Sequence, residues 1–347
     1  MDRILLAHGS GGQLSHDLIR DLFLPHFPAP TLAKLDDAAV VQPLASAATG
    51  AHPNISGASR LAFTTDSYVV KPLFFNGGDI GRLAVCGTVN DLAMVGATPL
   101  YLSAGFVIEE GLELETLRRV VASMKASAEE AGVEIVAGDT KVVERGGADK
   151  LFINTAGLGV VPPGIEISAS NAQPGDLVIL SGTIGDHGLA VLSEREGLAF
   201  KSQLASDAAP LNHLVSAMLE ASREIHVMRD PTRGGLATTL NEIARQSQVA
   251  IAIEESRIPV HEGVRAACEM LGYDPLYVAN EGKLVAIVAP RAAEAVLQAM
   301  RGDPYGKEAA IVGEVMAQPA GKVLLRTGIG GTRIVDMLAG EMLPRIC

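Results

Sequence analysis

The last residue of the chain is a cysteine, and a terminal thiol can do chemistry that an internal one cannot. Cys347 ends the run Pro344-Arg345-Ile346-Cys347. A thiolate is a strong nucleophile and can carry a covalent group. A residue at a chain end adds little to a core and is usually frayed, so the residue type alone favours no role. On a free tail, however, the thiol can load a group at one site and carry it to another.

Oxygen-donor side chains recur where the hydrophobic pattern predicts the end of a strand or a polar patch within a helix. The pattern predicts a strand over residues 61–67, a helix over 81–95 and a strand over 133–137. The oxygen donors beside or inside these elements are Asp36, Asp37, Asp66, Asn90, Asp91 and Asp139. Each one alone is typical of a turn or a cap. Together they favour a hard-cation site, because Mg²⁺ prefers oxygen ligands and usually bridges carboxylates to phosphates.

Two glycine-rich runs are typical of loops that approach an anion closely. The first is His-Gly-Ser-Gly-Gly at residues 8–12, and it is also compatible with a flexible lead-in. The second, at residues 228–235, contains two arginines, Asp230 and paired glycines ahead of a helix predicted to run to residue 244. A helix N-terminus with exposed amides favours phosphate. The alternative is an ordinary turn with Asp230 or Thr232 as the N-cap.

An acid and a lysine complete the set of residues with catalytic potential. Residues 276–288 are predicted to form two strands around a tight Asn-Glu-Gly turn, which places Glu281 either at an exposed tip or facing inward as a base. Lys141 follows Asp139 by two residues, after the strand predicted over 133–137. A lysine serves as a base only where burial or nearby cations lower its pKa; otherwise it is an electrostatic partner.

The usual sequence signatures of nucleotide binding are absent. Residues 302–307 resemble a P-loop but are one residue short, and Gly157-Leu158-Gly159 lacks the third glycine of a dinucleotide fingerprint. In an acid-rich chain without a basic phosphate clamp, metal bridging is the simplest way to hold a nucleotide.

The elements that must position these residues fall into two groups. A chain of 347 residues suggests two domains, and the Pro- and Gly-rich stretch at 162–175 is the predicted boundary. We therefore expect an N-terminal domain over 1–163, a C-terminal domain over 164–340 and a flexible tail over 341–347. Further helices are predicted at 17–23, 112–131, 210–221, 264–271 and 291–300, and further strands at 102–108, 151–161, 176–180, 249–253, 310–315 and 323–326.

Composition and charge exclude several classes of protein. With 28 basic and 40 acidic residues the net charge is −12 and no basic cluster is present, which argues against a nucleic-acid partner. Three widely spaced cysteines favour neither a disulfide framework nor a zinc site and fit the reducing cytoplasm; Cys86 and Cys268 have the setting of small core residues. No signal-peptide-like run opens the chain, and no apolar run reaches the roughly 18 residues of a membrane helix.

These motifs together resemble the carbamoyl dehydratase family of hydrogenase maturation, also called hydrogenase expression/formation protein E. Most are shared with a superfamily that includes aminoimidazole ribonucleotide synthetase, formylglycinamide ribonucleotide amidotransferase, selenophosphate synthetase and thiamine monophosphate kinase. The terminal Pro-Arg-Ile-Cys selects this member; a selenophosphate synthetase is expected to carry its reactive residue near the N-terminus, where this chain has no cysteine. The motifs are His8-Gly9-Ser10-Gly11-Gly12, Asp36-Asp37-Ala38-Ala39, Thr65-Asp66-Ser67, Gly87-Thr88-Val89-Asn90-Asp91-Leu92-Ala93, Gly138-Asp139-Thr140-Lys141, Arg229-Asp230-Pro231-Thr232-Arg233-Gly234-Gly235, Asn280-Glu281-Gly282 and the last four residues.

The resemblance implies a two-domain α+β fold like that of aminoimidazole ribonucleotide synthetase, with a mixed β-sheet in each domain and helices on one face. It implies a homodimer paired through the N-terminal domains, with ATP in the cleft between the halves. It further implies that a separate carbamoyltransferase loads Cys347 with a carbamoyl group. ATP would then dehydrate the thiocarbamate to a thiocyanate, and a maturation scaffold complex would accept the cyanide for the iron of a [NiFe] hydrogenase.

The resemblance also implies roles for individual residues. Cys347 is the catalytic carrier, and Glu281 and Lys141 are the candidates for the base that removes the N–H protons. Mg²⁺ ions that neutralise charge in phosphoryl transfer would be held by Asp36, Asp37, Asp66, Asp91 and Asp230. ATP would be bound by Gly9, Ser10, Gly11, Gly12, Asp66, Asn90, Asp91, Asp139, Arg233 and Gly234.

Two other hypotheses are left open by the sequence. One is a small-molecule ATP-dependent enzyme of the same superfamily, similar to selenophosphate synthetase or thiamine monophosphate kinase, whose tail is incidental. The other is a non-enzymatic carrier whose acidic motifs are only structural. Loss of activity on deletion of Cys347 would exclude the first, and Mg²⁺-dependent ATP binding measured by calorimetry would exclude the second.

Overall fold

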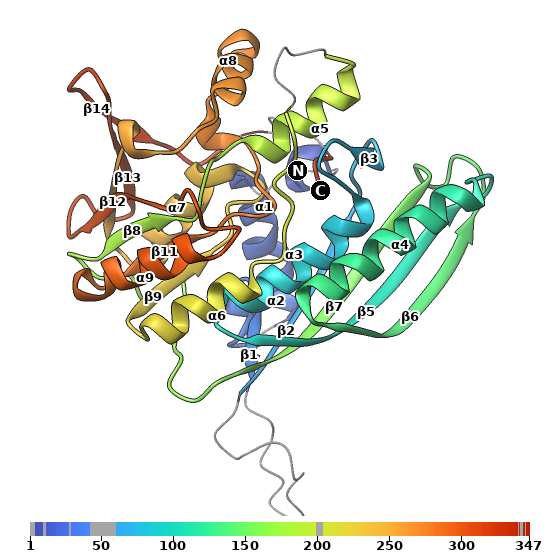
Figure 1. The fold of residues 1–347 in the computed structure, drawn as a ribbon, viewed down its shortest axis with the longest axis horizontal. Coiled ribbons are helices and arrows are strands. Elements are labelled where there is room, and N and C mark those ends of the chain that lie inside the picture. Colours follow the sequence, from blue (N-terminus) through green and yellow to red (C-terminus); the bar gives the residue numbers. More distant parts are fainter. Residues whose placement is uncertain are drawn as a thin grey trace, which may run out of the picture.

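The N-terminal half of the chain is organised on a five-stranded sheet. The computed structural model describes residues 4–9, 12–27, 29–41, 60–198, 204–338, 340, 343 and 345–347. In the strand order β1-β2-β7-β5-β6, only β5 and β6 are parallel, so the sheet is mixed (Figure 1). The strands are β1 (Ala39–Val41), β2 (Arg60–Tyr68), β5 (Thr98–Glu109), β6 (Glu134–Val143) and β7 (Leu151–Val161), and a separate hairpin joins β3 (Phe74–Phe75) to β4 (Gly78–Asp79).

Two helices, α3 (Ile80–Met94) and α4 (Leu114–Ala131), cover one face of this sheet (Figure 1). The side chain of Asp79 caps α3 by accepting hydrogen bonds from two backbone amides of its first turn. Helix α3 is buried along nearly its whole surface, so its polar patch is held inside the protein. Helix α4 is amphipathic and ends at Gly132, whose φ of 70° is one that glycine adopts without strain.

The C-terminal half is organised on a seven-stranded mixed sheet. Its strand order is β14-β13-β10-β12-β8-β11-β9, in which only β10 and β13 are parallel. The strands are β8 (Leu177–Leu180), β9 (Ile225–Arg229), β10 (Ala250–Glu254), β11 (Val285–Val288), β12 (Ala310–Met316), β13 (Lys322–Arg326) and β14 (Thr332–Val335). The helices are α5 (Asp186–Glu196), α6 (Asn212–Ala221), α7 (Gly235–Gln246), α8 (Glu262–Leu271) and α9 (Pro290–Gly302), with short 3₁₀ turns η4 (Glu255–Arg257) and η5 (Pro275–Tyr277).

Helices cover the seven-stranded sheet on both faces, and this corrects the expectation of helices on one face. Ile179 of β8 packs in the cluster that contains α6 and α9, whereas its neighbours Val178 and Leu180 pack with α7. A strand buried on both faces must be apolar at every position, and β11, with the sequence Val-Ala-Ile-Val, is. The one-face arrangement therefore describes only the N-terminal half.

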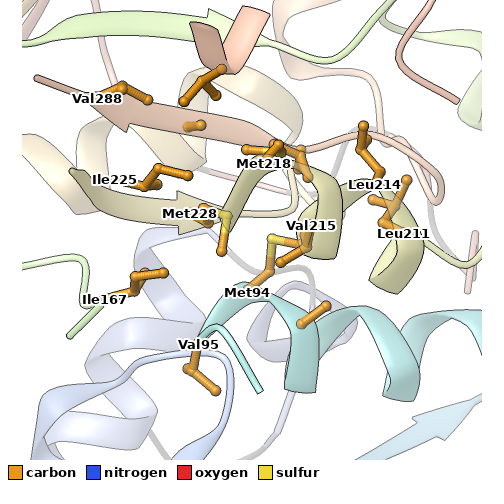
Figure 2. Close-up of a cluster of buried hydrophobic side chains, with 14 of the residues drawn as sticks. Met94, Val95, Ile167, Leu211, Leu214, Val215, Met218, Ile225, Met228 and Val288 are labelled. Atoms are coloured by element: carbon orange, nitrogen blue, oxygen red, sulfur yellow. The ribbon is translucent and has the colours of Figure 1, made fainter. Parts of the chain in front are cut away.

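The two halves share one apolar core, so packing fixes their relative placement. The cluster in Figure 2 combines the end of α3 with helix α6 and strands β9 and β11. Its labelled members are Met94, Val95, Ile167, Leu211, Leu214, Val215, Met218, Ile225, Met228 and Val288. A site assembled from both halves can therefore be held in a defined geometry.

The segment at 276–288 differs from the prediction of two strands around a turn. Only β11 forms, and residues 275–277 form the 3₁₀ turn η5. Asp274 caps this turn by accepting from the backbone amide of Leu276, and Pro275 occupies the first position, where its missing N–H is not needed. Glu281 consequently lies in a buried loop and is 4% exposed, which excludes an exposed turn tip.

Two predicted strand ends are also wrong. Strand β6 runs to Val143 and keeps a continuous parallel register with β5 from Ala137 onward, so Asp139 and Lys141 lie inside it. Asp66 likewise lies inside β2, two residues before its end. The pairing partner decides where a strand stops, and a single-strand pattern does not contain that information.

The N-terminal segment forms short helical pieces that contact the C-terminal half. The backbone amide of Gln13 donates to the carbonyl of Leu338 at 3.0 Å, and Figure 1 marks both chain ends near the centre of the view. The helix predicted at 17–23 begins earlier; the pieces are η1 (Leu6–Gly9), α1 (Gln13–Leu18), η2 (Ile19–Phe23), α2 (Leu24–His26) and η3 (Leu32–Lys34). Across the described ranges, no helix has the length and apolar character needed to cross a bilayer.

Candidate active site between the two halves

The loop that carries Glu281 is bound to the second glycine-rich run. The side-chain amide of Asn280, which is fully buried, donates to the carbonyl of Pro231 at 2.9 Å. Gly282 permits a close approach, because a Cβ there would lie 1.8 Å from the carbonyl oxygen of Asp207. The backbone amide of Glu281 donates to Asp207 Oδ1 at 3.0 Å. These contacts fix Glu281 beside the run that contains Pro231.

Glu281 has the properties of a proton-transfer group. Its Oε1 is buried and has no hydrogen-bond partner among the described residues. Burial raises the pKa of its carboxyl well above the ordinary value, and repulsion from Asp230 and Asp66 raises it further, against the opposing effect of Arg233. A buried carboxyl with a raised pKa and a free oxygen is an arrangement expected of a general acid or base.

Three more carboxyls, those of Asp37, Asp91 and Asp230, gather here from separate elements. Asp37 precedes β1, Asp91 lies on α3, and Asp230 follows β9. Burial is the largest cause of a raised pKa at all three, and for Asp230 it raises the pKa to about 6. Mutual repulsion adds to the effect, and Asp66 contributes to it at Asp91 and Asp230. These three carboxyls and Glu281 form the carboxyl cluster, whose mutual repulsion favours a bound cation.

The donor set fits Mg²⁺ ions that bind together with a nucleotide. Asp37 Oδ2 is buried without a hydrogen-bond partner in the described ranges, and Asp91 Oδ2 accepts from the hydroxyl of Thr64 at 2.7 Å. Among the residues that the structure describes, no three His, Cys, Asp or Glu side chains form a complete metal site. Mg²⁺ usually takes one or two carboxylates and completes its shell with water and phosphate oxygens. The arrangement suits that mode of binding.

A buried chain of ion pairs holds Asp37, and the sequence did not predict it. Arg229 lies 2.7 Å from Asp37 Oδ1 and 2.8 Å from Glu242 Oε2. The other oxygen of Glu242 lies 2.8 Å from His16 Nε2. Arg229 belongs to the second glycine-rich run, at residues 228–235, but no sequence signal links it to partners that are distant along the chain. The chain leaves one oxygen of Asp37 free to face the cluster.

Two predicted site residues are committed to contacts between the halves. Asp36 Oδ1 accepts from the backbone amide of Ala169 at 3.0 Å. Asn90 is 1% exposed; its Nδ2 donates to the carbonyl of Ala209 at 3.0 Å, and its Oδ1 accepts from the amide of Leu211 at 2.8 Å. These contacts give both residues a structural task where the halves meet.

Lys141 and Asp139 lie on a different surface from the carboxyl cluster. The Nζ of Lys141 is 2.7 Å from Asp139 Oδ2, and both side chains are about two-thirds exposed. Asp139 is in register, across β5 and β7, with Ser67 of β2. Adjacent residues of a strand point to opposite faces, so Asp139 faces away from the side on which Asp66 lies. One subunit therefore does not bring Lys141 to Glu281.

The first glycine-rich run lies against the second. Ser10 and Gly11 are outside the described residues, but their neighbours are placed. The carbonyl of Gly9 accepts from Arg233 Nη1 at 2.7 Å. Gly12 packs so closely that an added Cβ would lie 2.4 Å from a backbone carbonyl of residue 338. The two glycine-rich runs therefore lie side by side, and Arg233 of the second run binds the first.

The second run forms a left-handed turn that opens α7. Gly234 and Gly235 have φ of +77° and +60°, and a Cβ at Gly235 would lie 2.6 Å from each of two carbonyl oxygens. Only glycine fits both demands. Gly234 is itself the N-cap of α7, and among the described residues no side chain caps this helix, so neither Asp230 nor Thr232 has the capping role. A helix start without such a cap suits an anion site.

The terminal thiol is docked at the same place. Cys347 is 9% exposed, and an oxygen of its terminal carboxylate accepts from the amide of Val69 at 3.0 Å. Burial raises the pKa of the thiol to about 12; the Arg233 guanidinium opposes this, whereas Glu281 and Asp66 add to it. The tail therefore brings its thiol among groups from both halves. Pro344 lies outside the described residues.

The other cysteines are core residues, as predicted. Cys86 and Cys268 are 0% and 1% exposed, and burial raises the pKa of their thiols to about 12 and about 11. The three cysteines are free.

Comparison with known proteins assigns both halves. The N-terminal domain of AIR synthase related proteins matches residues 35–161, and the C-terminal domain matches 173–326. A carbamoyl dehydratase HypE from Bradyrhizobium diazoefficiens is 55% identical over 343 residues, which cover 99% of this chain and 95% of the relative. The chain belongs to the HypE family. The resemblance inferred from the motifs is thereby confirmed.

Solved structures of HypE proteins share the fold. The chain resembles one in a HypE-HypF complex with a TM-score of 0.85 and 49% identity, over 92% of this chain and 99% of that one. A HypE in complex with ATP matches with a TM-score of 0.80 and 53% identity, over 99% and 100% of the two chains. These likenesses confirm the predicted two-domain α+β fold with a mixed sheet in each domain.

Proposed function

We propose that the chain is an ATP-dependent carbamoyl dehydratase that acts on a carbamoyl group carried by its own Cys347. The docked tail carries this proposal, because it sets the terminal sulfur among Arg233, Glu281 and Asp66. The names of the HypE relatives and the ATP complex of one of them support it. In the reaction, the carbamoyl oxygen leaves as phosphate and the nitrogen loses both protons. The product is a thiocyanate on Cys347, which supplies the cyanide ligand of [NiFe] hydrogenases.

The docked position suits dehydration and does not suit loading. A thiol with a pKa of about 12 is almost entirely protonated at neutral pH and is a poor nucleophile. Once the sulfur carries a carbamoyl group, it no longer needs to ionise, and a buried site protects the intermediate from water. The tail would therefore be loaded undocked and dehydrated docked, which agrees with an enzyme in which the tail is essential.

Glu281 is the proposed base for the nitrogen of the carbamoyl group. Its Oε1 has no hydrogen-bond partner within the described ranges, its raised pKa makes it bind a proton more readily than an ordinary carboxylate does, and its backbone is fixed by Asp207. Arg233 interacts electrostatically with the thiol of Cys347 and would offer positive charge to the oxygen that is phosphorylated.

The carboxyl cluster is the proposed magnesium site, with Asp37, Asp66, Asp91 and Asp230 as oxygen donors. Bound Mg²⁺ supplies charge neutralisation for phosphoryl transfer from ATP. The backbone amides at Gly234 and the loop at residues 9–12 are proposed to bind phosphate. Asp36 and Asn90, whose polar atoms bind backbone groups, would support this site through the junction between the halves.

A homodimer is the proposed assembly, formed through the open face and edge of the five-stranded sheet. Strand β6 is an edge strand, and nine of its ten residues are exposed. An exposed edge with apolar side chains is typical of an interface. Exposed apolar residues of these strands include Phe63 on β2, Tyr101 and Val107 on β5, and Ile135, Val136 and Val142 on β6. A second copy on this surface would bring the exposed Lys141 and Asp139 to a site in its partner, where both retain their predicted roles.

The proposed partners follow from the two ends of the reaction. A carbamoyltransferase must load Cys347, and the HypE-HypF complex supports a protein partner of this kind. A maturation scaffold complex would accept the cyanide. A free carrier thiol requires reducing conditions, so we place the reaction in the cytoplasm. We retain the division into residues 1–163, 164–340 and a tail at 341–347.

Intact-protein mass spectrometry tests the function. The chain is incubated with the carbamoyltransferase, carbamoyl phosphate, ATP and Mg²⁺, and the modified peptide is mapped by fragmentation. We expect a carbamoyl adduct on Cys347 that loses the mass of water only when ATP is present. Cys347→Ser, a matched oxygen analogue, should show no adduct. An unmodified Cys347 in the presence of an active carbamoyltransferase would leave an ATP-binding enzyme of the same superfamily with another substrate.

A further inference from the structure

The docked tail is held by side chains that have no role in the chemical steps proposed above. Its backbone pairs with the segment that follows β2: the amide of Val69 donates to an oxygen of the terminal carboxylate of Cys347 at 3.0 Å, and that of Lys71 donates to the carbonyl of Arg345 at 3.3 Å. Between them Ile346 is 3% exposed and packs in the core of the N-terminal half. Backbone pairing alone would suit many tail sequences, so side chains must decide where the sulfur is placed.

Two side chains of helix α5 bind the tail from the C-terminal half. Arg195 donates through one terminal nitrogen to the carbonyl of Arg345 at 2.6 Å, and through Nε to the carbonyl of Lys71 at 2.8 Å. His187 Nε2 lies 3.0 Å from the carbonyl of Ile346. Because a carbonyl oxygen only accepts, this nitrogen carries the proton, and the other ring nitrogen accepts from the hydroxyl of Ser206 at 2.8 Å. Helix α5 thus binds two successive carbonyls of the tail.

The N-terminal half binds the side chain of Arg345. Asp149 accepts from Arg345 Nη1 at 2.6 Å and lies 3.0 Å from the Nζ of Lys71. The Nε of Arg345 donates to the carbonyl of Val69 at 2.9 Å. Arg345 has a φ of 52°, in the left-handed region that non-glycine residues rarely adopt, so its surroundings must hold it there. The contacts from the two halves converge within three residues of the thiol.

We propose that Arg195, His187 and Asp149 are positioning residues that hold the tail docked and thereby serve dehydration but not loading. The inference rests on the proposed function. Docking places the sulfur beside Glu281, where dehydration occurs, and it buries the thiol that loading requires. Weakening these contacts therefore shifts the tail toward the undocked state. Loading should become no slower, while dehydration slows because the competent state is less populated.

The variants should alter the receptor and leave the tail unchanged, so that the carbamoyltransferase meets the same tetrapeptide. Arg195→Met removes the contacts that Arg195 makes with the carbonyls of Lys71 and Arg345, and Asp149→Asn weakens the contact from the other half. Arg301→Met is the matched control. Arg301 lies on helix α9 and also donates to a backbone carbonyl, that of Ala309 at 3.0 Å. Arg195→Lys should retain part of the effect of the native residue, since a lysine can still bind one carbonyl.

Three readouts on the full chain separate positioning from general damage. The first is the rate of alkylation of Cys347 by iodoacetamide at pH 8, with Cys86 and Cys268 as buried internal references. The others are single-turnover rates of carbamoyl loading and of ATP-dependent loss of water. For Arg195→Met and Asp149→Asn we expect alkylation about tenfold faster and loss of water about tenfold slower, as for loss of a hydrogen bond to a charged group. Loading should be unchanged or faster.

The opposite signs of the two half-reactions make the test decisive. Equal losses in loading and dehydration, or no change in the alkylation of Cys347, would overturn the proposal, and Arg301→Met should match the unaltered chain in all three rates. If the unaltered chain shows no ATP-dependent loss of water, the proposed function fails, whereas the alkylation rates still decide whether these residues hold the tail. If Arg195→Met does not fold, as judged by thermal unfolding, Asp149→Asn decides the outcome from the opposite side.

Discussion

The carboxyl cluster and strand β6 each carry part of the predicted catalytic machinery, but they are built in opposite ways. Glu281 is 4% exposed, and its backbone is bound by Asp207 of the C-terminal half and by Asn90 of the N-terminal half. The side chain of Lys141 is 68% exposed on an edge strand, and its amino group binds Asp139, two residues earlier on the same strand. A group that must transfer a proton needs a fixed and dry environment. Within one subunit, Glu281 therefore has the environment that proton transfer needs. Lys141 does not have it and would gain it only if a second subunit covered this surface.

The largest expected effect comes from the buried side of this comparison. Glu281→Gln keeps the size of the side chain and removes its ability to accept a proton. We expect ATP-dependent loss of water from carbamoylated Cys347 to slow by about a thousandfold, in the range lost with a general base. Carbamoyl loading and ATP binding should persist, because the backbone contact to Asp207 remains. Glu110→Gln, on the exposed surface, is the control, and an equal loss in that variant would discard Glu281 as the base.

The exposed side of the comparison predicts a loss that a second subunit can repair. Lys141→Ala should slow dehydration by about a hundredfold. If Lys141 acts across a dimer, mixing this variant with Glu281→Gln should restore about a quarter of the native activity, because half the dimers are mixed and each has one intact site. If both residues act within one subunit, no mixture recovers.

The same experiment needs proof that the dimer uses the proposed surface. Tyr101→Asp places a charge on the open face of the sheet and should yield monomers by light scattering, with loss of the recovery described above. Ile329→Asp makes the same kind of change at a residue that is 97% exposed in the C-terminal half, and it should remain dimeric. If the native chain is monomeric, both the proposed dimer interface and the action of Lys141 in the partner's site are excluded.

Local patterns predicted much of the fold but little of the site. The strand expected at 151–161 is observed as β7, and the helices expected at 81–95 and 112–131 are observed within two residues of their predicted starts. Apolar periodicity reports how a segment meets its own core, so it locates single elements well. It failed at 276–288, where a prolyl 3₁₀ turn produces the same run of apolar residues as a strand.

Contacts that are distant along the chain were beyond the reach of these patterns. The motifs named Asp37, Asp230 and Glu281, but no pattern linked Arg229 to Asp37 or His187 to the tail. Such pairs lack any fixed spacing, since they depend on how two domains pack. The motifs also predicted an ATP-binding role for Asn90, but its side-chain amide binds the backbone of the other half. A polar residue inside a helix has a task, but the sequence does not say whether that task is chemical or structural.

The smallest expected effect concerns the charge of the cluster. Asp230 has a pKa of about 6 in the fold against an ordinary 3.8, so the folded state binds its proton more tightly than the unfolded chain does. Metal-free protein should therefore lose stability as the pH rises through the window from about 4 to about 6, and should stay less stable above it. Mg²⁺ with ATP, added to chain without a carbamoyl group, should raise the melting temperature by a few degrees at pH 8 and by less at pH 5. Asp230→Asn should reduce this pH dependence without abolishing it, because Asp37, Asp91 and Glu281 also have raised pKa values, whereas Asp336→Asn, at an exposed position, should leave it unchanged. Equal Mg²⁺ shifts at both pH values in the native chain would mean that the buried carboxyls of the cluster do not bind the metal, and the contrast with the exposed surface of β6 would then lie in packing alone.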